Sequence, residues 1–480
     1  MKIQKYDAVV VGSGPNGLAA AITLAQKNLS VLIVEAKATV GGGMRSAELT
    51  LPGFVHDICS AIHPLASGSP FFRTLPLDRF GLEFIEPPAS LAHPFDDGTA
   101  VLLRRSIEET AAAFGSDKEI YRQIFAPLAE NWTPLADDIL APLGIPQHPL
   151  LMARFGLKAL QSARGFAERN FQESRAQAVF AGCAAHSMIP LENLSTAAFG
   201  LVLNTLAHSV GWNFPRGGTQ KIADALADYF ISIGGAIEVN HTVENIAELD
   251  FADVVLFDLT PQQILKIAGN RLSESFRRRL SRFQYGSGVF KMDFALNSPI
   301  PWRDAECSRA ATVHLGGTMA EIASAERLNA RGTTADNPFV LVAQTSLFDD
   351  SRAPAGQHTA WAYCHVPNDS PVDMSEIIEN QIERFAPGFR DCILAKKTFS
   401  PRDLENYNAN YIGGDINGGA AILSQIFTRP VAKIDPYALP AKGLYVCSSS
   451  TPPGGGVHGM CGFHAAQSVL RNEKQFRGLM

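Results

Sequence analysis

The sequence predicts an α/β protein built on a parallel sheet, and three observations support this fold class. Ala8, Val9, Val10 and Val11 form an apolar, β-branched run that is typical of a buried parallel strand. A glycine-rich turn, an Ala-rich helix at 18–27 and a second strand at 30–34 follow directly. A strand, a loop of small residues and a helix then recur at 443–472. The chain has 480 residues, beyond the size of about 250–300 at which one core usually divides, so two domains are expected.

The turn after the first strand, residues 12–17 with the sequence GSGPNG, fits the pattern G-x-G-x-x-G. Gly12 permits a tight turn, Gly14 lets the backbone approach a pyrophosphate, and Gly17 lets the helix pack on the strand. The helix that follows directs free N–H groups and a partial positive charge at a phosphate. Glu35 ends the second strand, 18 residues after Gly17, near the spacing of a ribose-binding carboxylate. We therefore predict a bound dinucleotide. A 2′-phosphate would meet the like charge of Glu35, which leaves FAD or NAD.

Two more glycine-rich loops are predicted to face the same ligand. Residues 40–46, VGGGMRS, follow the second strand and indicate backbone close to a ligand, with a merely flexible loop as the alternative. Residues 454–459, GGGVHG, also fit G-x-G-x-x-G, but only 21 residues follow them, with no second strand and no terminal acid. This loop is therefore not an independent nucleotide-binding unit. We expect it to start a helix over 457–472, whose N-terminus points at the same cofactor.

The middle of the chain predicts a helical part and further strands. Residues 106–210 read as mainly helical, with a capping box at Ser106 and Glu109. The segment 150–169 is basic and amphipathic, which indicates either a helix on a membrane surface or an ordinary helix with a solvated face. Strands that return to the first sheet are expected at 236–239, 242–247 and 254–258, and strands of a second sheet at 287–296, 340–345 and 359–365.

Composition limits the partners and the compartment. The net charge of −6 gives no electrostatic reason to expect nucleic acid as a partner. Seven cysteines are scattered without C-x-x-C or zinc-like spacing, so we expect no metal site and a reducing compartment. The start of the chain leaves no room for a signal peptide, and no apolar run reaches the roughly 18 residues of a membrane span. We therefore expect a cytoplasmic protein, with a peripheral membrane contact left open. The sequence does not predict an oligomeric state.

Five stretches of the sequence resemble one family. They are GSGPNG with Glu35, GGGMRS at 41–46, PRGGTQKIADAL at 215–226, YIGGDINGGAAILSQIFTRP at 411–430, and GLYVCSSSTPPGGGVHGMCGFHAA at 443–466. Together they resemble the phytoene desaturase-like FAD-dependent oxidoreductases of the flavin amine oxidase superfamily, especially poorly characterised members labelled NAD(P)/FAD-dependent oxidoreductases. The resemblance implies FAD as the cofactor. It also implies a Rossmann-like FAD-binding domain that is discontinuous, with an inserted α+β substrate domain.

The two glycine clusters at the ends of the chain set the expected domain boundaries. If both meet one FAD, the FAD-binding domain comprises residues 1–80, 211–285 and 420–480. The substrate domain then has a mainly helical part at 81–210 and a sheet at 286–419. Val11, Glu35 and Cys447 should end at one edge of the parallel sheet, and the substrate cavity should open between the domains.

The resemblance assigns cofactor contacts position by position. Gly12, Gly14 and Gly17 would meet the FAD pyrophosphate, Glu35 the adenosine ribose, and the backbone of Val243 the adenine. Residues 457–460 would lie at the isoalloxazine end. The full predicted cofactor-binding set is Gly12, Ser13, Gly14, Pro15, Asn16, Gly17, Glu35, Ala36, Gly42, Gly43, Met44, Arg45, Val243, Gly456, Val457, His458, Gly459 and Met460.

Two side chains are candidate catalytic residues. His458 should stand at the start of a helix that adjoins the flavin, and a structural role is the alternative. Lys291 belongs to an alternating segment, 289–294, in which a buried charge is costly unless it has a partner. The segment FKMDFALNSPIPW at 290–302 resembles the amine oxidase strand whose lysine binds a water near flavin N5. The alternative for Lys291 is an exposed lysine on an edge strand.

Three functions follow from these observations as competing hypotheses. The first is an FAD-dependent oxidoreductase that acts on an apolar, carotenoid- or isoprenoid-like substrate by desaturation, saturation or isomerisation. The second is a flavin oxidase of the amine oxidase kind, with oxygen as acceptor and Lys291 assisting. The third is a non-catalytic member of the fold that binds a lipid or a protein; the intact GSGPNG and Glu35 argue against it.

Overall fold

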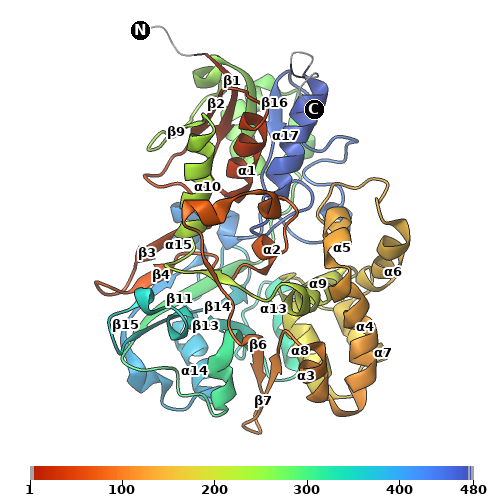
Figure 1. Cartoon of the computed structure of the whole chain (residues 1–480), viewed down its shortest axis with the longest axis vertical. Helices are drawn as coiled ribbons and strands as arrows, with labels where there is room; N and C mark the ends of the chain where they lie inside the picture. Colours follow the sequence, from red (N-terminus) through yellow and green to blue (C-terminus); the bar gives the residue numbers. More distant parts are fainter. Residues whose placement is uncertain (1–4, 474–475, 477–480) are drawn as a thin grey trace.

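A five-stranded parallel sheet forms one end of the molecule (Figure 1). The computed structural model describes residues 5–473 and 476. The strands run in the order β16-β10-β1-β2-β9, and each neighbouring pair is parallel. Their bounds are β1 (Tyr6–Val11), β2 (Val31–Val34), β9 (Ala236–Glu238), β10 (Ala252–Phe257) and β16 (Leu444–Val446). Val11, Glu35 and Cys447 therefore lie at one edge, where the carboxyl ends of the strands meet.

Helices cover both faces of this sheet, which explains why β1 is apolar at successive positions. Val10 belongs to the core shared with α1, α10 and α17, whereas Val9 belongs to the core shared with α11 and α12. A Cβ on Gly462 of α17 would clash with the carbonyl oxygen of Asn16 in α1, so these two helices cross in backbone contact. The helices are α1 (Pro15–Ala25), α10 (Gln220–Ser232), α11 (Pro261–Ala268), α12 (Glu274–Leu280) and α17 (Met460–Asn472).

A seven-stranded sheet forms the other end of the molecule (Figure 1). Its order is β15-β11-β14-β13-β12-β6-β7; only β12 and β6 pair in parallel. The turn at 96–99 joins β6 to β7. The strands are β6 (Ala89–Pro94), β7 (Ala100–Leu103), β11 (Gly288–Leu296), β12 (Ala310–Leu315), β13 (Val340–Ala343), β14 (His358–Val366) and β15 (Ile393–Phe399).

The predicted helical part is present; it follows β7 of the larger sheet and precedes β9 of the parallel sheet. Ser106 caps the first of its helices by accepting a hydrogen bond from the backbone N–H of Glu109 at 3.2 Å. The last two helices, α8 and α9, are largely buried. The helices are α3 (Ile107–Ala112), α4 (Lys118–Glu130), α5 (Trp132–Ile139), α6 (Pro149–Ala159), α7 (Ala163–Asn170), α8 (Ser174–Ala185) and α9 (Thr196–Ser209).

Shorter elements complete the fold. Two small antiparallel ribbons pair β3 with β4 and β5 with β8. The remaining strands and helices are β3 (Ser46–Glu48), β4 (Val55–Asp57), β5 (Phe84–Ile85), β8 (Phe214–Pro215), α2 (Pro64–Ser67), α13 (Met319–Ala330), α14 (Ser375–Phe385), α15 (Pro401–Tyr407) and α16 (Leu423–Ile426).

Two predicted elements differ from the structure. The strand expected at 242–247 is wrong: this segment is an irregular connection that leads into a short 3₁₀ helix, Ile246–Leu249. Asn245 caps that helix, and such local side-chain bonds compete with strand pairing. The last helix begins at Met460 and not at 457, because Gly456 and Gly459 take left-handed φ angles of +126° and +70°. The preceding glycines thus form a loop and not a helical turn.

The origin of the strands supports the proposed domain division. The parallel sheet takes its strands from 6–34, 236–257 and 444–446, and the larger sheet takes its strands from 89–103 and 288–399. Boundaries at 80, 210, 285 and 419 stay a proposal.

Candidate active site

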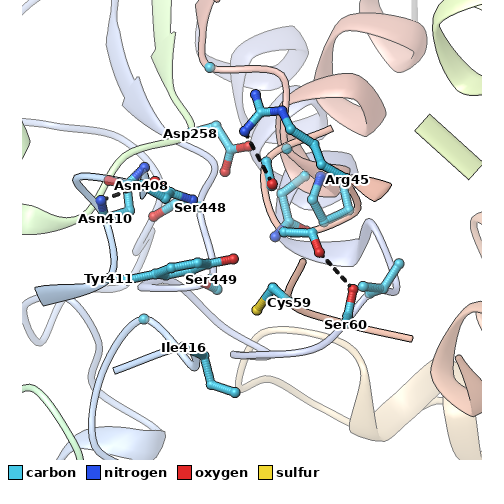
Figure 2. A pocket seen from close by; sticks show the side chains of 18 of the residues that line it. Arg45, Cys59, Ser60, Asp258, Asn408, Asn410, Tyr411, Ile416, Ser448 and Ser449 are labelled. Atoms are coloured by element: carbon cyan, nitrogen blue, oxygen red, sulfur yellow. Dashed lines mark hydrogen bonds between the residues drawn. The ribbon is translucent and has the colours of Figure 1, made fainter. Parts of the chain in front are cut away.

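One cavity of about 950 Å³ opens at the edge where the strands of the parallel sheet end. Gly12 follows β1, Glu35 follows β2, Asp258 follows β10, and Ser448 lies just after β16; all four line the cavity. Ligands of open parallel sheets bind at this edge. Figure 2 shows Asp258, Ser448 and Arg45 in one part of the cavity, and Tyr411, Cys59 and Ile416 in a neighbouring part.

The predicted glycines form a close-packed cradle at the start of α1. Gly12 has a φ of +101°, which side chains rarely permit. A Cβ on Gly17 would overlap the carbonyl oxygen of Gly12, so this glycine lets α1 pack against the end of β1. A Cβ on Gly42 would lie 2.9 Å from the Cα of Gly14, which brings the second glycine loop directly over the first. The two loops together leave bare backbone facing the cavity.

Glu35 is held in place by four protein donors. Its Oε2 accepts hydrogen bonds from the backbone N–H of Ser13 at 3.0 Å and from the Ser13 hydroxyl at 2.5 Å. Its Oε1 accepts one from the backbone N–H of Lys37 at 2.8 Å and forms an ion pair with Arg45 at 3.1 Å. A carboxylate offers about four lone-pair sites. A ribose hydroxyl that binds Glu35 would therefore share an oxygen with one of these donors.

Asp258 is a cavity residue that the sequence reasoning missed. Its Oδ2 accepts a hydrogen bond from the backbone N–H of Gly17 at 3.0 Å, and it would lie 2.5 Å from a Cβ on Gly14. Burial, with a smaller contribution from the charge of Glu35, raises the pKa of Asp258 to about 7. The carboxyl group thus occupies the N–H groups that would face a phosphate. Its position at the end of a predicted strand was the signal that could have found it.

Tyrosines and a cysteine line the middle of the cavity (Figure 2). The Tyr411 hydroxyl lies 2.5 Å from the position of a Cβ on Gly43, so only a glycine fits there. The Ser60 hydroxyl donates to the carbonyl oxygen of Gly43 at 2.9 Å and fixes the same loop from the other side. Burial raises the pKa of both Tyr411 and Cys59, so both side chains are neutral at pH 7.

The remaining part of the cavity is apolar and aromatic. Trp361 and Tyr363 on β14 stack with ring centroids 5.4 Å apart and an interplanar angle of 24°. Leu341 on β13, Leu203 on α9 and Trp212 add further apolar surface. One face of the seven-stranded sheet and the helical layer therefore enclose this part. It can bind an apolar group next to the glycine cradle.

The structure brings together most of the predicted cofactor-binding residues but not all of them. The predicted residues that line the cavity are Gly12, Ser13, Gly14, Pro15, Asn16, Glu35, Ala36, Gly42, Gly43, Arg45, Val243, Gly456 and Val457. Those that do not line it are Gly17, Met44, His458, Gly459 and Met460. The carbonyl oxygen of Gly12 occupies the space where a Gly17 side chain would lie, and Met44 is fully buried in the core. The contacts assigned to FAD stay a prediction.

The His458 side chain supports the loop around it. Its Nδ1 accepts a hydrogen bond from the backbone N–H of Met460 at 3.0 Å, at the first turn of α17. Its Nε2 therefore carries the proton and donates to the carbonyl oxygen of Gly454 at 3.2 Å. Both ring nitrogens are used, and burial lowers the pKa of His458 to about 4. This geometry supports the structural alternative for His458.

Lys291 is buried and paired, and it does not line the cavity. The alternative of an exposed lysine on an edge strand is wrong, because β11 lies between β14 and β15 and Lys291 is 2% exposed. Its ammonium group forms an ion pair with Asp293 on the same strand and lies over the ring of Phe399. The required partner is thus present, and it ties Lys291 to the core of the second sheet.

The residues that line the cavity determine which kind of cofactor it can hold. Among the residues that the structure describes, no group of three or more His, Cys, Asp or Glu side chains is placed to hold a metal ion. FAD fits better: the cradle of Gly12, Gly14 and Gly42 admits backbone contact with a diphosphate, and Arg45 supplies a nearby positive charge. Apolar surface for a ring system lies in the same cavity. Across residues 5–473, no helix has both the length and the apolar character needed to cross a membrane.

Comparisons with known proteins relate almost the whole chain to oxidoreductases. Residues 10–75 match the model of an NAD(P)-binding Rossmann-like domain. The chain is 24% identical over 558 residues to rat pyridine nucleotide-disulfide oxidoreductase domain-containing protein 2, covering 98% of this chain and 94% of the relative. It is 23% identical to a lycopene-forming phytoene desaturase of Pseudescherichia vulneris, with 97% and 99% covered. Among solved structures, putrescine oxidase bound to putrescine superposes with a TM-score of 0.64 at 18% identity, covering 98% of this chain and all of that one.

These matches confirm the resemblance and the fold class. The chain resembles phytoene desaturase-like oxidoreductases along its length. The likeness to putrescine oxidase is one of fold, and the mixed α/β architecture with a Rossmann-like parallel sheet is the one predicted.

Proposed function

We propose that this chain is an FAD-dependent oxidoreductase that dehydrogenates an apolar, isoprenoid-like substrate. The observation that carries the proposal is that one continuous cavity joins the glycine cradle to a surface of Trp212, Leu203 and the stacked pair Trp361 and Tyr363. When bound, FAD supplies the two-electron acceptor chemistry. Saturation or isomerisation of a related substrate would use the same cavity.

This chain's own residues would hold the cofactor and shape the substrate site. The cradle of Gly12, Gly14 and Gly42 would meet the diphosphate, and Glu35 with Val243 would lie at the adenosine end. The apolar surfaces of β14 and α9 would orient the substrate and exclude water. Such a site needs little further machinery, because the cofactor carries the redox step.

The test is anaerobic reduction of the bound flavin. FAD-loaded protein is mixed with phytoene or retinol in detergent micelles, and the flavin absorbance is followed; we expect it to bleach. Putrescine serves as the comparison, because it probes the amine oxidase hypothesis. Bleaching by putrescine alone would replace the proposed substrate class by the second hypothesis. A colourless protein that binds no added FAD would favour the non-catalytic hypothesis.

The oxidase hypothesis has less support from the geometry. It needs Lys291 beside the cofactor, but the Lys291 side chain is paired with Asp293 and does not line the cavity. No described carboxylate other than Glu35, Glu244 and Asp258 lines the cavity; Glu35 and Asp258 follow strands of the parallel sheet, and Glu244 lies in the irregular connection after β9. A cationic amine would therefore meet a neutral, aromatic wall there.

We further propose that α6 and the loop before it contact a membrane surface peripherally. Ile145, Leu150 and Leu157 are 98%, 78% and 77% exposed; on α6, the basic residue Arg154 is exposed and Lys158 is half-buried. Basic residues beside exposed apolar side chains are suited to an anionic lipid surface. The test is flotation with vesicles of phosphatidylcholine and phosphatidylserine. We expect binding that is lost in a Leu150→Ser/Leu157→Ser variant; equal flotation of the two proteins would contradict the proposal.

A further inference from the structure

His63 lines the cavity where its two parts meet, and the proposed function does not use this residue. On one side, Ser60 bonds to the carbonyl oxygen of Gly43, in the second glycine loop, through its backbone N–H at 3.2 Å and its hydroxyl at 2.9 Å. On the other side, the backbone N–H of His63 donates to the carbonyl oxygen of Asn213 at 2.7 Å, directly after Trp212 of the apolar part. A substrate bound in the apolar part would therefore meet the cofactor beside His63.

One backbone carbonyl determines which ring nitrogen of His63 carries the proton. The Thr219 hydroxyl lies 2.8 Å from the carbonyl oxygen of Ser60 and 3.0 Å from Nε2 of His63. A carbonyl oxygen only accepts, so the single hydroxyl proton points to Ser60, because two accepting oxygens at this distance would otherwise repel each other. The hydroxyl oxygen of Thr219 must then accept from Nε2 of His63. A neutral His63 ring therefore carries its proton on Nε2, and its Nδ1 has a bare lone pair.

Nδ1 of His63 is free to accept a proton from a bound molecule. It makes no hydrogen bond within the described ranges 5–473 and 476, and it is not one of the fully enclosed polar atoms without a partner. His63 is only 2% exposed, and the space that it borders is the cavity. The bare nitrogen therefore opens into the cavity.

We propose that Nδ1 of His63 accepts the substrate proton in the dehydrogenation, and that Thr219 is the positioning residue that keeps this nitrogen bare. This inference rests on the proposed function. One C–H bond of the substrate breaks with its electron pair, and the hydride passes to the flavin. The neighbouring C–H bond then breaks, its proton bonds to Nδ1 of His63, and its electron pair forms the C=C bond. The cofactor holds the hydride and the histidine holds the proton, so atoms and charges balance.

His63 is neutral at rest and has a buried carboxylate behind it. Burial lowers the pKa of His63 to about 4, and the charge of Asp57 partly opposes this shift. Asp57 accepts from the backbone N–H of Thr219 at 2.8 Å and forms a buried ion pair with Arg352 at 2.7 Å. A weak base suffices for this step, because loss of hydride makes the adjacent C–H far more acidic than an imidazolium. A neutral ring also leaves the apolar part of the cavity without a permanent charge.

The first experiment compares flavin reduction by phytoene in FAD-loaded wild type, His63→Gln and a control. His63→Gln keeps an N–H donor for Thr219 but has no basic nitrogen. We expect its limiting reduction rate to fall by about 10²–10⁴-fold, with probe affinity unchanged, since general-base catalysis contributes about that factor. His358→Gln is the matched control, because His358 is half-buried and lies outside the cavity; it should reduce the flavin as fast as wild type. Equal rates for wild type and His63→Gln would overturn the histidine proposal alone; no bleaching of wild type by any probe would overturn the proposed function and this inference with it.

The second experiment locates the proton directly and needs no substrate. Nitrogen-15 spectra of histidine-labelled, FAD-loaded wild type report which ring nitrogen of His63 carries the proton, with His63→Gln for assignment. At neutral pH we expect an unprotonated Nδ1 and a protonated Nε2. A proton on Nδ1 of wild-type His63 would overturn the proposal.

Two substitutions test Thr219 as the positioning residue. Thr219→Val keeps the backbone N–H that bonds to Asp57 but has no hydroxyl oxygen to accept from Nε2 of His63. Its spectrum should show both tautomers of His63, and its reduction rate should fall by about 2–10-fold, since one neutral hydrogen bond contributes about that factor to the tautomer ratio. Thr219→Ser restores the hydroxyl group and should restore both the tautomer and the rate. A slower Thr219→Val with an unchanged tautomer would show that Thr219 only packs, and would overturn its positioning role.

Discussion

The carboxyl group of Asp258 should make FAD binding depend on pH. It accepts from the backbone N–H of Gly17 at 3.0 Å, at the place where a diphosphate would meet α1, and its pKa is raised to about 7, mainly by burial. A neutral carboxyl group can stay beside a diphosphate. An ionised one would repel it by about 4 kcal/mol at 4 Å and an effective dielectric constant of 20. Bound FAD therefore favours the protonated form, and binding takes up a proton above the pKa.

The magnitude follows from this linkage. Below pH 7 the group is already protonated, so the affinity should be constant; above pH 7 it should fall tenfold for each pH unit. From pH 5.5 to pH 8.5 we expect an affinity loss of about 30-fold, or about 2 kcal/mol, because one pKa unit corresponds to 1.36 kcal/mol. The repulsion of about 4 kcal/mol between an ionised Asp258 and the diphosphate exceeds these 2 kcal/mol. FAD therefore binds only the protonated form over this pH range, and the full loss of about 30-fold in affinity is expected.

Asp258→Asn is the matched variant, since its amide oxygen still accepts from the Gly17 N–H while its charge is constant. The assay is fluorescence quenching of FAD titrated with apoprotein at each pH. His241 also lines the cavity, and a hydrogen bond with Glu238 raises its pKa, so both proteins should share a small residual pH dependence. The difference between wild type and Asp258→Asn isolates the carboxyl group. Parallel profiles for the two proteins would refute the reasoning.

Two further predictions test the cradle and the buried ion pair. Gly17→Ala should abolish FAD binding in a flavin titration, because the added Cβ overlaps the carbonyl oxygen of Gly12. The control is Gly156→Ala in α6, whose added Cβ meets nothing within 4 Å; it should bind FAD normally, and its free energy of unfolding should rise by about 0.5–1 kcal/mol. Equal FAD binding by the two variants would contradict the packing argument. Lys291→Met should lower the free energy of unfolding in urea by about 3–5 kcal/mol, because it leaves the Asp293 carboxylate buried without its cation. Unchanged stability with slower reoxidation of the flavin by air would instead support the oxidase hypothesis.

The sequence predicted the parts of the site that depend on the backbone. Gly12, Gly14 and Gly17 are required by a positive φ angle or by close contacts of the backbone. These requirements are local, so they produce a fixed spacing of glycines that is visible in the sequence. The prediction of a strand at 242–247 was wrong because the Asn245 side chain caps a short 3₁₀ helix there. Whether such a local cap or strand pairing prevails depends on neighbours that are distant in sequence. The spacing of Glu35 predicted a ribose-binding carboxylate, but it did not predict the four donors that hold this side chain, because they come from three separate stretches of the chain.

Side chains that meet through tertiary contacts left weaker signals. His186 and His314 are 128 residues apart, and neither belongs to a motif, so their pairing required the packing of α8 on the seven-stranded sheet. Lys291 shows the opposite error. The segment around it resembles a functional strand, but a partner two residues away, Asp293, draws the ammonium group into the core. The local pattern identified a buried charge at Lys291, but it did not show whether the side chain points to the cavity or to the core.

The crossing of α1 with α17 has a consequence for the order of events during synthesis. The Ser69 hydroxyl, close to the first glycine loops, donates to the carbonyl oxygen of His458, which is made 389 residues later. At about 5–20 residues per second, a ribosome needs roughly 20–80 s to bridge that interval. During this time the parallel sheet lacks its edge strand β16, which pairs with β10, and α1 lacks α17, the helix that packs on it. The proposed FAD site would therefore be complete only after translation of the last helix, and we expect a chain that lacks α17 to have an open, apolar sheet and to bind no flavin.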